Sequence, residues 1–154
     1  METAARAQEM LDAFARANVL ASECPSRQVL QHLTSRWGVL VMAVLATGTY
    51  RFAQLRRRIE GVSERMLAQT LQQLEQDGFV HRRDHGEVPP RVDYTLTPLG
   101  MEAAGHLVGL VAWIENNMPR VNAAQAGIAE GIAEGIAEDT ALTPSADRSV
   151  PVSV

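Results

Sequence analysis

Several residue types that support common protein chemistries are scarce in this chain. Its 154 residues include a single cysteine, Cys24, so no disulfide can form within the chain. The four histidines lack the spacing of metal ligands, and we interpret them as ordinary surface or packing residues. The sequence shows no paired carboxylates, nucleophile elbow or phosphate-binding glycine loop. We therefore expect a protein that is not an enzyme and has no catalytic residues, metal site or cofactor.

Long apolar runs are also absent. No stretch is long enough to span a bilayer, and the N-terminal segment carries acidic residues in place of the basic stretch that begins a secretory signal. With 46% hydrophobic residues, the chain can bury one core of domain size and carry appendages. We expect a soluble cytoplasmic protein that has no membrane partner.

Charge is distributed unevenly along the chain. The formal net charge is −4, which argues against a nonspecific polycation. Residues 27–91 nevertheless contain ten arginines and six acidic residues, whereas residues 121–154 contain one arginine and five acidic residues. A basic segment within an acidic chain favours a nucleic-acid-binding surface in that segment.

The basic segment has the order of a helix-turn-helix. We expect a helix from Phe52 to Arg58, a break at residues 60–62, and a second helix that begins after Ser63. The Ser63 hydroxyl can accept from the first unpaired backbone N–H groups of that helix. Gly78 is expected to end it in the left-handed conformation. This arrangement places the second helix in a DNA groove.

The second helix has two different faces. One stripe is apolar, with Leu67, Leu71 and Leu74, and the opposite stripe carries Arg65, Gln69, Gln72 and Gln76. Arginine and glutamine side chains match the guanine and adenine edges of the major groove. Taken alone, such a stripe also fits any solvent-facing helix, and it is the surrounding pattern that favours base recognition.

A hairpin follows the second helix. Residues 79–84 and 91–96 are expected to pair as strands around a loop at residues 85–90, which contains two prolines. Thr97-Pro98 then has the pattern of an N-cap followed by proline in the first helical turn. The sequence predicts a mainly α fold with a small β-hairpin wing, a winged helix-turn-helix.

The final helix, from Pro98 to about Asn117, has more apolar surface than one winged-helix core can cover. A second copy of the chain is the expected partner for this surface, and packing on the N-terminal helix of the same chain is the alternative. The expected parts are an N-terminal helix over residues 1–22, a DNA-binding domain over 23–97, a C-terminal dimerisation helix over 98–120 and an acidic tail over 121–154.

The tail contains Gly-Ile-Ala-Glu three times in succession from Gly127. Each glycine costs a helix about 1 kcal/mol, which offsets what the other three residues contribute. We therefore expect the tail to be weakly helical and mostly disordered.

Several patches of the sequence resemble the HxlR-type transcriptional regulators, a winged-helix branch near the MarR group. The matching positions are Cys24-Pro25, Leu30, Arg36-Trp37, Arg51-Phe52, Leu55-Arg56, Gly61-Val62-Ser63, Leu67, Leu71, Leu74, Glu75, Asp77-Gly78, Val88-Pro89-Pro90-Arg91-Val92, Tyr94, Leu96-Thr97 and Gly100. The resemblance implies a homodimeric bacterial repressor or activator without a catalytic site, with dimer contacts from the N-terminal helix over residues 1–22 and from the final helix. The expected fold is therefore a winged helix-turn-helix with N- and C-terminal dimerisation helices. Ser35 stands where the family commonly has glycine, and the segment after Val121 has no counterpart in the family pattern.

The expected partner is double-stranded DNA with a palindromic operator, bound by a homodimer. We predict that Arg65 and Gln69 read bases and that Arg56, Arg82 and Arg91 mainly neutralise phosphates. The full set of predicted DNA-binding residues is Arg51, Arg56, Ser63, Arg65, Gln69, Gln72, Arg82 and Arg91. The alternative is a winged-helix protein-interaction module without DNA affinity.

Cys24 is the candidate sensing residue. Some members of the family respond to quinones, aldehydes or other thiol-reactive compounds through a cysteine at the Cys-Pro position, so the resemblance implies an electrophile or another small molecule as effector. A thiol at a helix N-terminus also has its thiolate form favoured by the helix dipole. The alternative is that Cys24 packs as a small buried hydrophobic residue.

Overall fold

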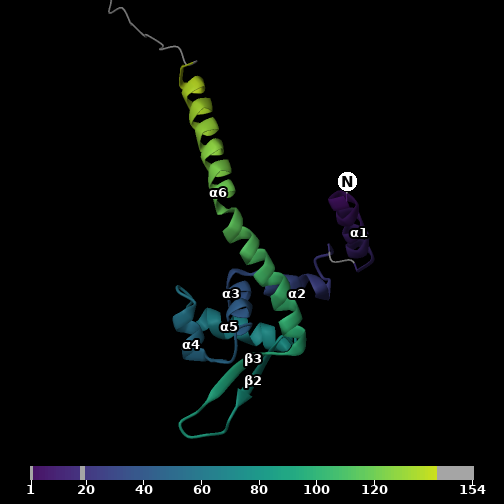
Figure 1. Cartoon of the computed structure of the whole chain (residues 1–154), viewed down its shortest axis with the longest axis vertical. Coiled ribbons are helices and arrows are strands. Elements are labelled where there is room, and N and C mark those ends of the chain that lie inside the picture. The colour runs from purple at the N-terminus through teal and green to yellow at the C-terminus, as the bar shows by residue number, and fades with distance from the viewer. Residues whose placement is uncertain (1, 18–19, 142–154) are drawn as a thin grey trace, which may run out of the picture. The chain divides into compact units, whose positions relative to one another are not determined.

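The structure is a computed structural model that describes residues 2–17 and 20–141 (Figure 1). Within these ranges the elements are α1 (Glu2–Ala17), α2 (Pro25–Thr34), α3 (Arg36–Leu45), β1 (Tyr50–Arg51), α4 (Phe52–Arg58), α5 (Glu64–Gln76), β2 (Val80–Asp84), β3 (Val92–Leu96) and α6 (Pro98–Ala141). The chain divides into two units, with the boundary between Val111 and Ala112 inside α6. The predicted mainly α fold with a hairpin wing is confirmed.

The core of the first unit lies between the helix-turn-helix and the helix before it. Its largest fully buried side chains are Val41, Met42, Leu45, Leu55, Leu67, Leu71 and Leu74. Three of these leucines form the predicted apolar stripe of α5, and the first three residues come from the apolar segment that forms α3. Burying one such side chain stabilises the fold by about 1.5–3 kcal/mol. The core therefore holds α5 by its apolar face and leaves the polar face outside.

Both ends of α5 are capped as predicted. The Ser63 Oγ accepts from the backbone N–H of Met66 at 3.1 Å. Gly78 follows the last turn with φ +85°, and the N–H of Phe79 donates to the carbonyl of Leu74 at 2.9 Å. A side chain at Gly78 would be strained in this left-handed conformation. Both ends of α5 are therefore determined by residues that lie next to them in the sequence.

The sheet contains one strand more than the sequence analysis expected. The strands are antiparallel in the order β1-β3-β2, so β3 is central. The added strand β1 has two residues, Tyr50 and Arg51, which lie opposite Tyr94 and Asp93. So short a strand has no periodicity from which it could be predicted. The pairing of β1 with β3 joins the start of α4 to the wing.

The last helix is longer than expected. It begins as predicted, with the Thr97 Oγ1 accepting from the N–H of Gly100 at 3.0 Å, but it continues past Asn117 and Pro119 to Ala141. The expectation of a mostly disordered tail therefore differs from the structure over residues 121–141. The alanine, isoleucine and glutamate between the three repeated glycines are compatible with a helix. A Cβ on any of Gly127, Gly131 and Gly135 would meet no neighbour, so these glycines cost the helix conformational entropy and no packing contact requires them. Residues 142–154 of the expected tail lie outside the described residues.

Helices α1 and α6 each carry several exposed apolar side chains. On α1 these are Met10, Leu11 and Phe14, and on α6 they are Leu99, Met101, Val108, Leu110, Trp113, Ile114, Ile128, Ile132 and Ile136. None of the described helices is both long enough and apolar enough to cross a bilayer.

Candidate nucleic-acid interface

The polar face of α5 is open to solvent. Arg65, Gln69, Gln72 and Gln76 are all exposed, whereas the leucines on the opposite face are buried. The face therefore offers forked hydrogen-bonding groups along a helix whose other side is held by the core, which is the geometry that base recognition in the major groove requires. Ser63 is exposed at the start of this face, with its hydroxyl oxygen engaged as the cap.

The predicted phosphate contact Arg56 lies close to the start of α5. Its Nη1 donates to Glu64 Oε1 at 2.9 Å, with side chains 48% and 71% exposed. The sequence analysis did not predict this acidic partner. An exposed pair of this kind is weak, about 0–1 kcal/mol, so it restrains Arg56 without preventing a phosphate contact.

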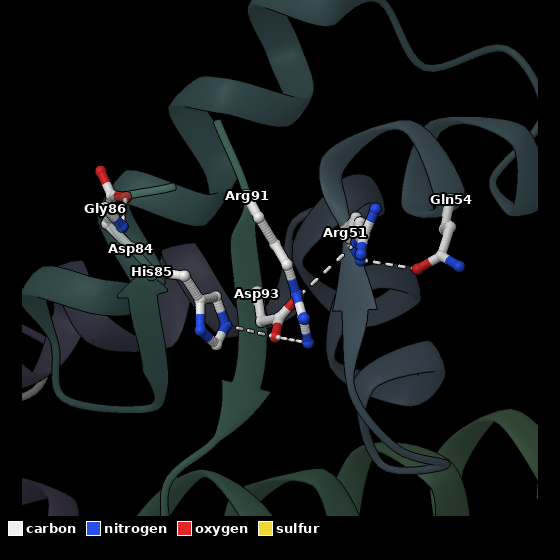
Figure 2. Close-up of polar contacts among 7 residues, drawn as sticks. All are labelled: Arg51, Gln54, Asp84, His85, Gly86, Arg91 and Asp93. Carbon is white, nitrogen blue, oxygen red and sulfur yellow. Dashed lines mark hydrogen bonds and ion pairs between the residues drawn. The ribbon is translucent and has the colours of Figure 1, made fainter. Parts of the chain in front are cut away.

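Arg51 and Arg91, which are forty residues apart, meet at one carboxylate in the sheet (Figure 2). Asp93 Oδ2 accepts from His85 Nε2 at 2.7 Å and from Arg91 Nη2 at 3.3 Å. Its Oδ1 is 3.9 Å from Arg51 Nε. The hydrogen bond from His85 is the main cause that lowers the pKa of Asp93, with Arg91 adding to it against the opposing effect of burial.

Asp93 and His85 were missed in the sequence analysis as members of the interface. A signal was present, because Arg91 and Asp93 are two residues apart on an expected strand and so share one face. Only the pairing of β1 with β3 brings Arg51 to the same place.

His32 and Asp77 form a second such pair, at 2.6 Å between Nδ1 and Oδ2, which ties α2 to the end of α5.

Arg82 lies on the exposed part of β2, directly opposite Tyr94. It shares a shallow hollow with Gln72 and Glu75 of α5. The structure therefore brings Arg82 close to the polar face of the recognition helix, whereas Arg51 and Arg91 form the separate group around Asp93.

Cys24 occupies the N-cap position of α2, with Pro25 in the first helical turn. The Sγ atom is 2.9 Å from the Ser26 hydroxyl oxygen. This hydrogen bond is the main cause that lowers the pKa of the thiol, helped by the backbone N–H groups of Ser26 and Arg27. The thiol is partly exposed, in a hollow lined mainly by polar side chains. The site thus has the features of a thiol that ionises more readily than usual.

A capped second helix with an exposed polar face, a hairpin wing and a basic surface define a winged helix-turn-helix transcriptional regulator. Residues 32–122 match the HxlR-like helix-turn-helix family, and the chain belongs to this family. Its members are transcriptional regulators and not enzymes. The family assignment made from the sequence is confirmed, and the Gly-Ile-Ala-Glu segment lies beyond the matched residues.

Two known proteins called YtfH are similar to this chain. The HTH-type transcriptional regulator YtfH of Escherichia coli is 56% identical over 108 residues, which are 70% of this chain and 86% of that protein. The structure of the transcriptional regulator YtfH from Salmonella typhimurium has 54% identity and a TM-score of 0.68, covering 71% of this chain and 98% of that one.

A redox regulator is also among the similar structures. HypR in its reduced form has 30% identity and a TM-score of 0.60, covering 64% of this chain and 98% of that one.

Proposed function

We propose that this regulator binds a palindromic operator as a homodimer and represses the adjacent genes. The observation that carries the proposal is the exposed Arg65, Gln69 and Gln72 face on a helix whose opposite face is buried in the core. Arg65 and Gln69 read bases, and Arg51, Arg56, Arg82 and Arg91 neutralise phosphates, while Ser63 lies at the helix start. Repression follows when the bound dimer blocks access to a promoter.

The homodimer is supported by the exposed apolar faces of α1 and α6. Met10 and Leu11 on α1, and Leu99 and Leu110 on α6, are each about half exposed, with fractions between 49% and 53%. Exposed apolar faces of this extent mark interaction surfaces, and the commonest partner for them is a second copy related by two-fold symmetry. Two-fold symmetry in the protein matches a palindrome in the DNA.

The experiment compares DNA fragments. The full-length chain is titrated against the intergenic DNA beside its own gene and against a shuffled fragment of equal length, at two salt concentrations. We expect the intergenic DNA to bind at least about 10³-fold more tightly, with binding that weakens as salt rises. Equal affinity for both fragments would overturn sequence-specific binding. Absence of any DNA binding would favour the protein-interaction module instead.

Cys24 is the proposed sensor of thiol-reactive compounds. Its position at the N-cap of α2, its lowered pKa and the likeness to a redox regulator support this role. Since the chain has no second cysteine, a disulfide would have to join two subunits or attach a small thiol. We expect diamide or a quinone to reduce operator affinity of the wild type and to leave Cys24→Ser unchanged. Equal responses of the two proteins would leave Cys24 as a packing residue.

A further inference from the structure

One carboxylate connects the helix-turn-helix with both ends of the wing loop. Asp93, in the central strand β3, contacts Arg51 of β1 as well as His85 and Arg91 (Figure 2). His85 and Arg91 begin and end the wing loop, where the N–H of His85 donates to the carbonyl of Arg91 at 3.0 Å. Arg51 immediately precedes α4. The acidic group thus lies where three segments converge.

Burial differs sharply within this cluster. The side chains of Asp93 and His85 are 14% and 15% exposed, whereas those of Arg51 and Arg91 are 56% and 41% exposed. The acid therefore lies inside, and the two arginine side chains are the more exposed members, although the Nε atom of Arg91 is itself buried. The backbone of Arg51 is also held, because its N–H donates to Gln54 Oε1 at 2.8 Å. An approaching phosphate would meet the two cations before the carboxylate.

We propose that Asp93 is a positioning residue for DNA binding, which holds the guanidinium groups of Arg51 and Arg91 in place for contact with the phosphate backbone. The inference rests on the proposed function, in which these two arginines neutralise phosphates. A long arginine side chain loses rotamer freedom when it binds, and a carboxylate that already restrains the side chain reduces this cost. Asp93 also fixes the wing loop relative to β1, so both arginines approach the DNA together.

The sign of one substitution separates this role from a simple charge effect. Asp93→Asn removes a negative charge, and on charge alone it strengthens DNA binding. If Asp93 positions the arginines, Asp93→Asn instead weakens operator binding, by about three- to tenfold. The slope of log affinity against log salt also flattens, by about 0.9 for each phosphate that the protein no longer neutralises. The charge argument and the positioning argument thus predict opposite results.

A matched control exists on the same hairpin. Asp84 lies at the end of β2, where its Oδ1 accepts from the N–H of Gly86 at 2.9 Å. Asp84→Asn removes the same charge and keeps a carbonyl oxygen for that hydrogen bond, so we expect it to bind the operator as tightly as wild type or more tightly. Asp93→Glu, which keeps the charge, is expected to recover part of the affinity that Asp93→Asn loses.

A measurement without DNA tests the positioning directly. In free protein, ¹⁵N relaxation of the Nε–H groups of Arg51 and Arg91 should report greater mobility in Asp93→Asn than in wild type, with the exposed Arg65 of α5 unchanged. Thermal unfolding of each variant shows whether the fold is retained. If Asp93→Asn unfolds, the same comparison is made with Asp93→Glu, whose longer arm also displaces the two guanidinium groups.

Distinct results overturn distinct statements. Operator binding by Asp93→Asn that equals or exceeds wild type, as in Asp84→Asn, overturns the positioning role, and so does unchanged mobility of both arginines. Wild-type affinity in both Arg51→Ala and Arg91→Ala overturns their phosphate contacts and the positioning role with them. Failure of the wild type to bind any DNA overturns the proposed function, while the relaxation measurement still decides whether Asp93 restrains the arginines.

Discussion

At the scale of single residues, the arginines of the interface differ in whether an acid restrains them. Arg56 is paired with exposed Glu64, and Arg51 and Arg91 share Asp93, which is largely buried. An exposed pair breaks at small cost, whereas a carboxylate that is only 14% exposed loses more when its partners leave, because less water can replace them. We therefore expect arginines of equal charge to contribute unequally to DNA binding.

The first prediction separates base recognition from phosphate contact. Gln69→Ala should lose about 1–3 kcal/mol of discrimination among operator variants, because we propose that this side chain on the polar face of α5 reads bases. Arg82→Ala should weaken all DNA sequences alike and flatten the salt slope by about one. Both variants are titrated against operator variants over a range of salt. Uniform weakening by both substitutions would show that the two roles are not divided in this way.

A second prediction concerns acid pH. The pKa of Asp93 in the fold lies below its ordinary value of 3.8, mainly because His85 donates a hydrogen bond to it. The unfolded chain therefore binds a proton more readily than the native protein does. Stability contributed by Asp93 is fully present above that ordinary value and is lost as the pH falls through the lower, folded pKa.

Urea midpoints of wild type and Asp93→Asn between pH 6 and pH 3 measure this effect. Wild type should lose more stability than the variant over the acidic end of this range, because the other carboxyl groups are common to both proteins. If the urea midpoints of the two proteins fall in parallel as the pH is lowered, the native pKa of Asp93 is not lowered as stated.

At the scale of elements, helix α5 depends on its N-cap residue, Ser63, in two ways. The Ser63 hydroxyl caps α5, and Ser63 is also a proposed DNA-binding residue. The helix has a defined start only because this oxygen satisfies a backbone N–H that the helix cannot pair internally.

Two substitutions at Ser63 separate these roles. Ser63→Ala should lower the free energy of unfolding by about 0.5–2 kcal/mol, since the cap is lost. Ser63→Asp keeps a capping oxygen and should retain stability, but its charge should weaken DNA binding through repulsion of phosphate. Urea unfolding and operator titration are measured on both variants. Equal stability in Ser63→Ala and wild type would show that the cap contributes little.

At the scale of the whole molecule, the apolar faces of α1 and α6 and the acidic segment beyond the family match have separate expected roles. The exposed apolar residues of α6 occur on both sides of residue 121, but the acidic residues accumulate after it. The family match ends at residue 122. We therefore propose that the part before Val121 folds, dimerises and binds DNA without the remainder.

Truncation after Arg120 tests this proposal. The shortened chain should fold, and should form the homodimer that we propose for the full chain, because the repeated glycines make the removed helix weak by itself. DNA binding should be unchanged or tighter, since five acidic residues leave with one arginine. Analytical ultracentrifugation and operator titration provide the measurements. A monomeric truncated protein would show instead that residues after Arg120 take part in the dimer.

Local patterns in the sequence determined the helix-turn-helix, its caps, the hairpin wing and the buried and exposed faces of α5, because each depends on residues within a few positions of one another. Tertiary structure decided which charged side chains from distant segments meet. Strand β1 is too short to show a pattern, and its pairing with β3 places Arg51 beside Asp93, forty-two residues later. Helix α6 exceeds its predicted length because its glycines cost conformational entropy without removing the backbone N–H groups that the helix pairs. Contacts between distant segments depend on packing and register, which no local pattern records.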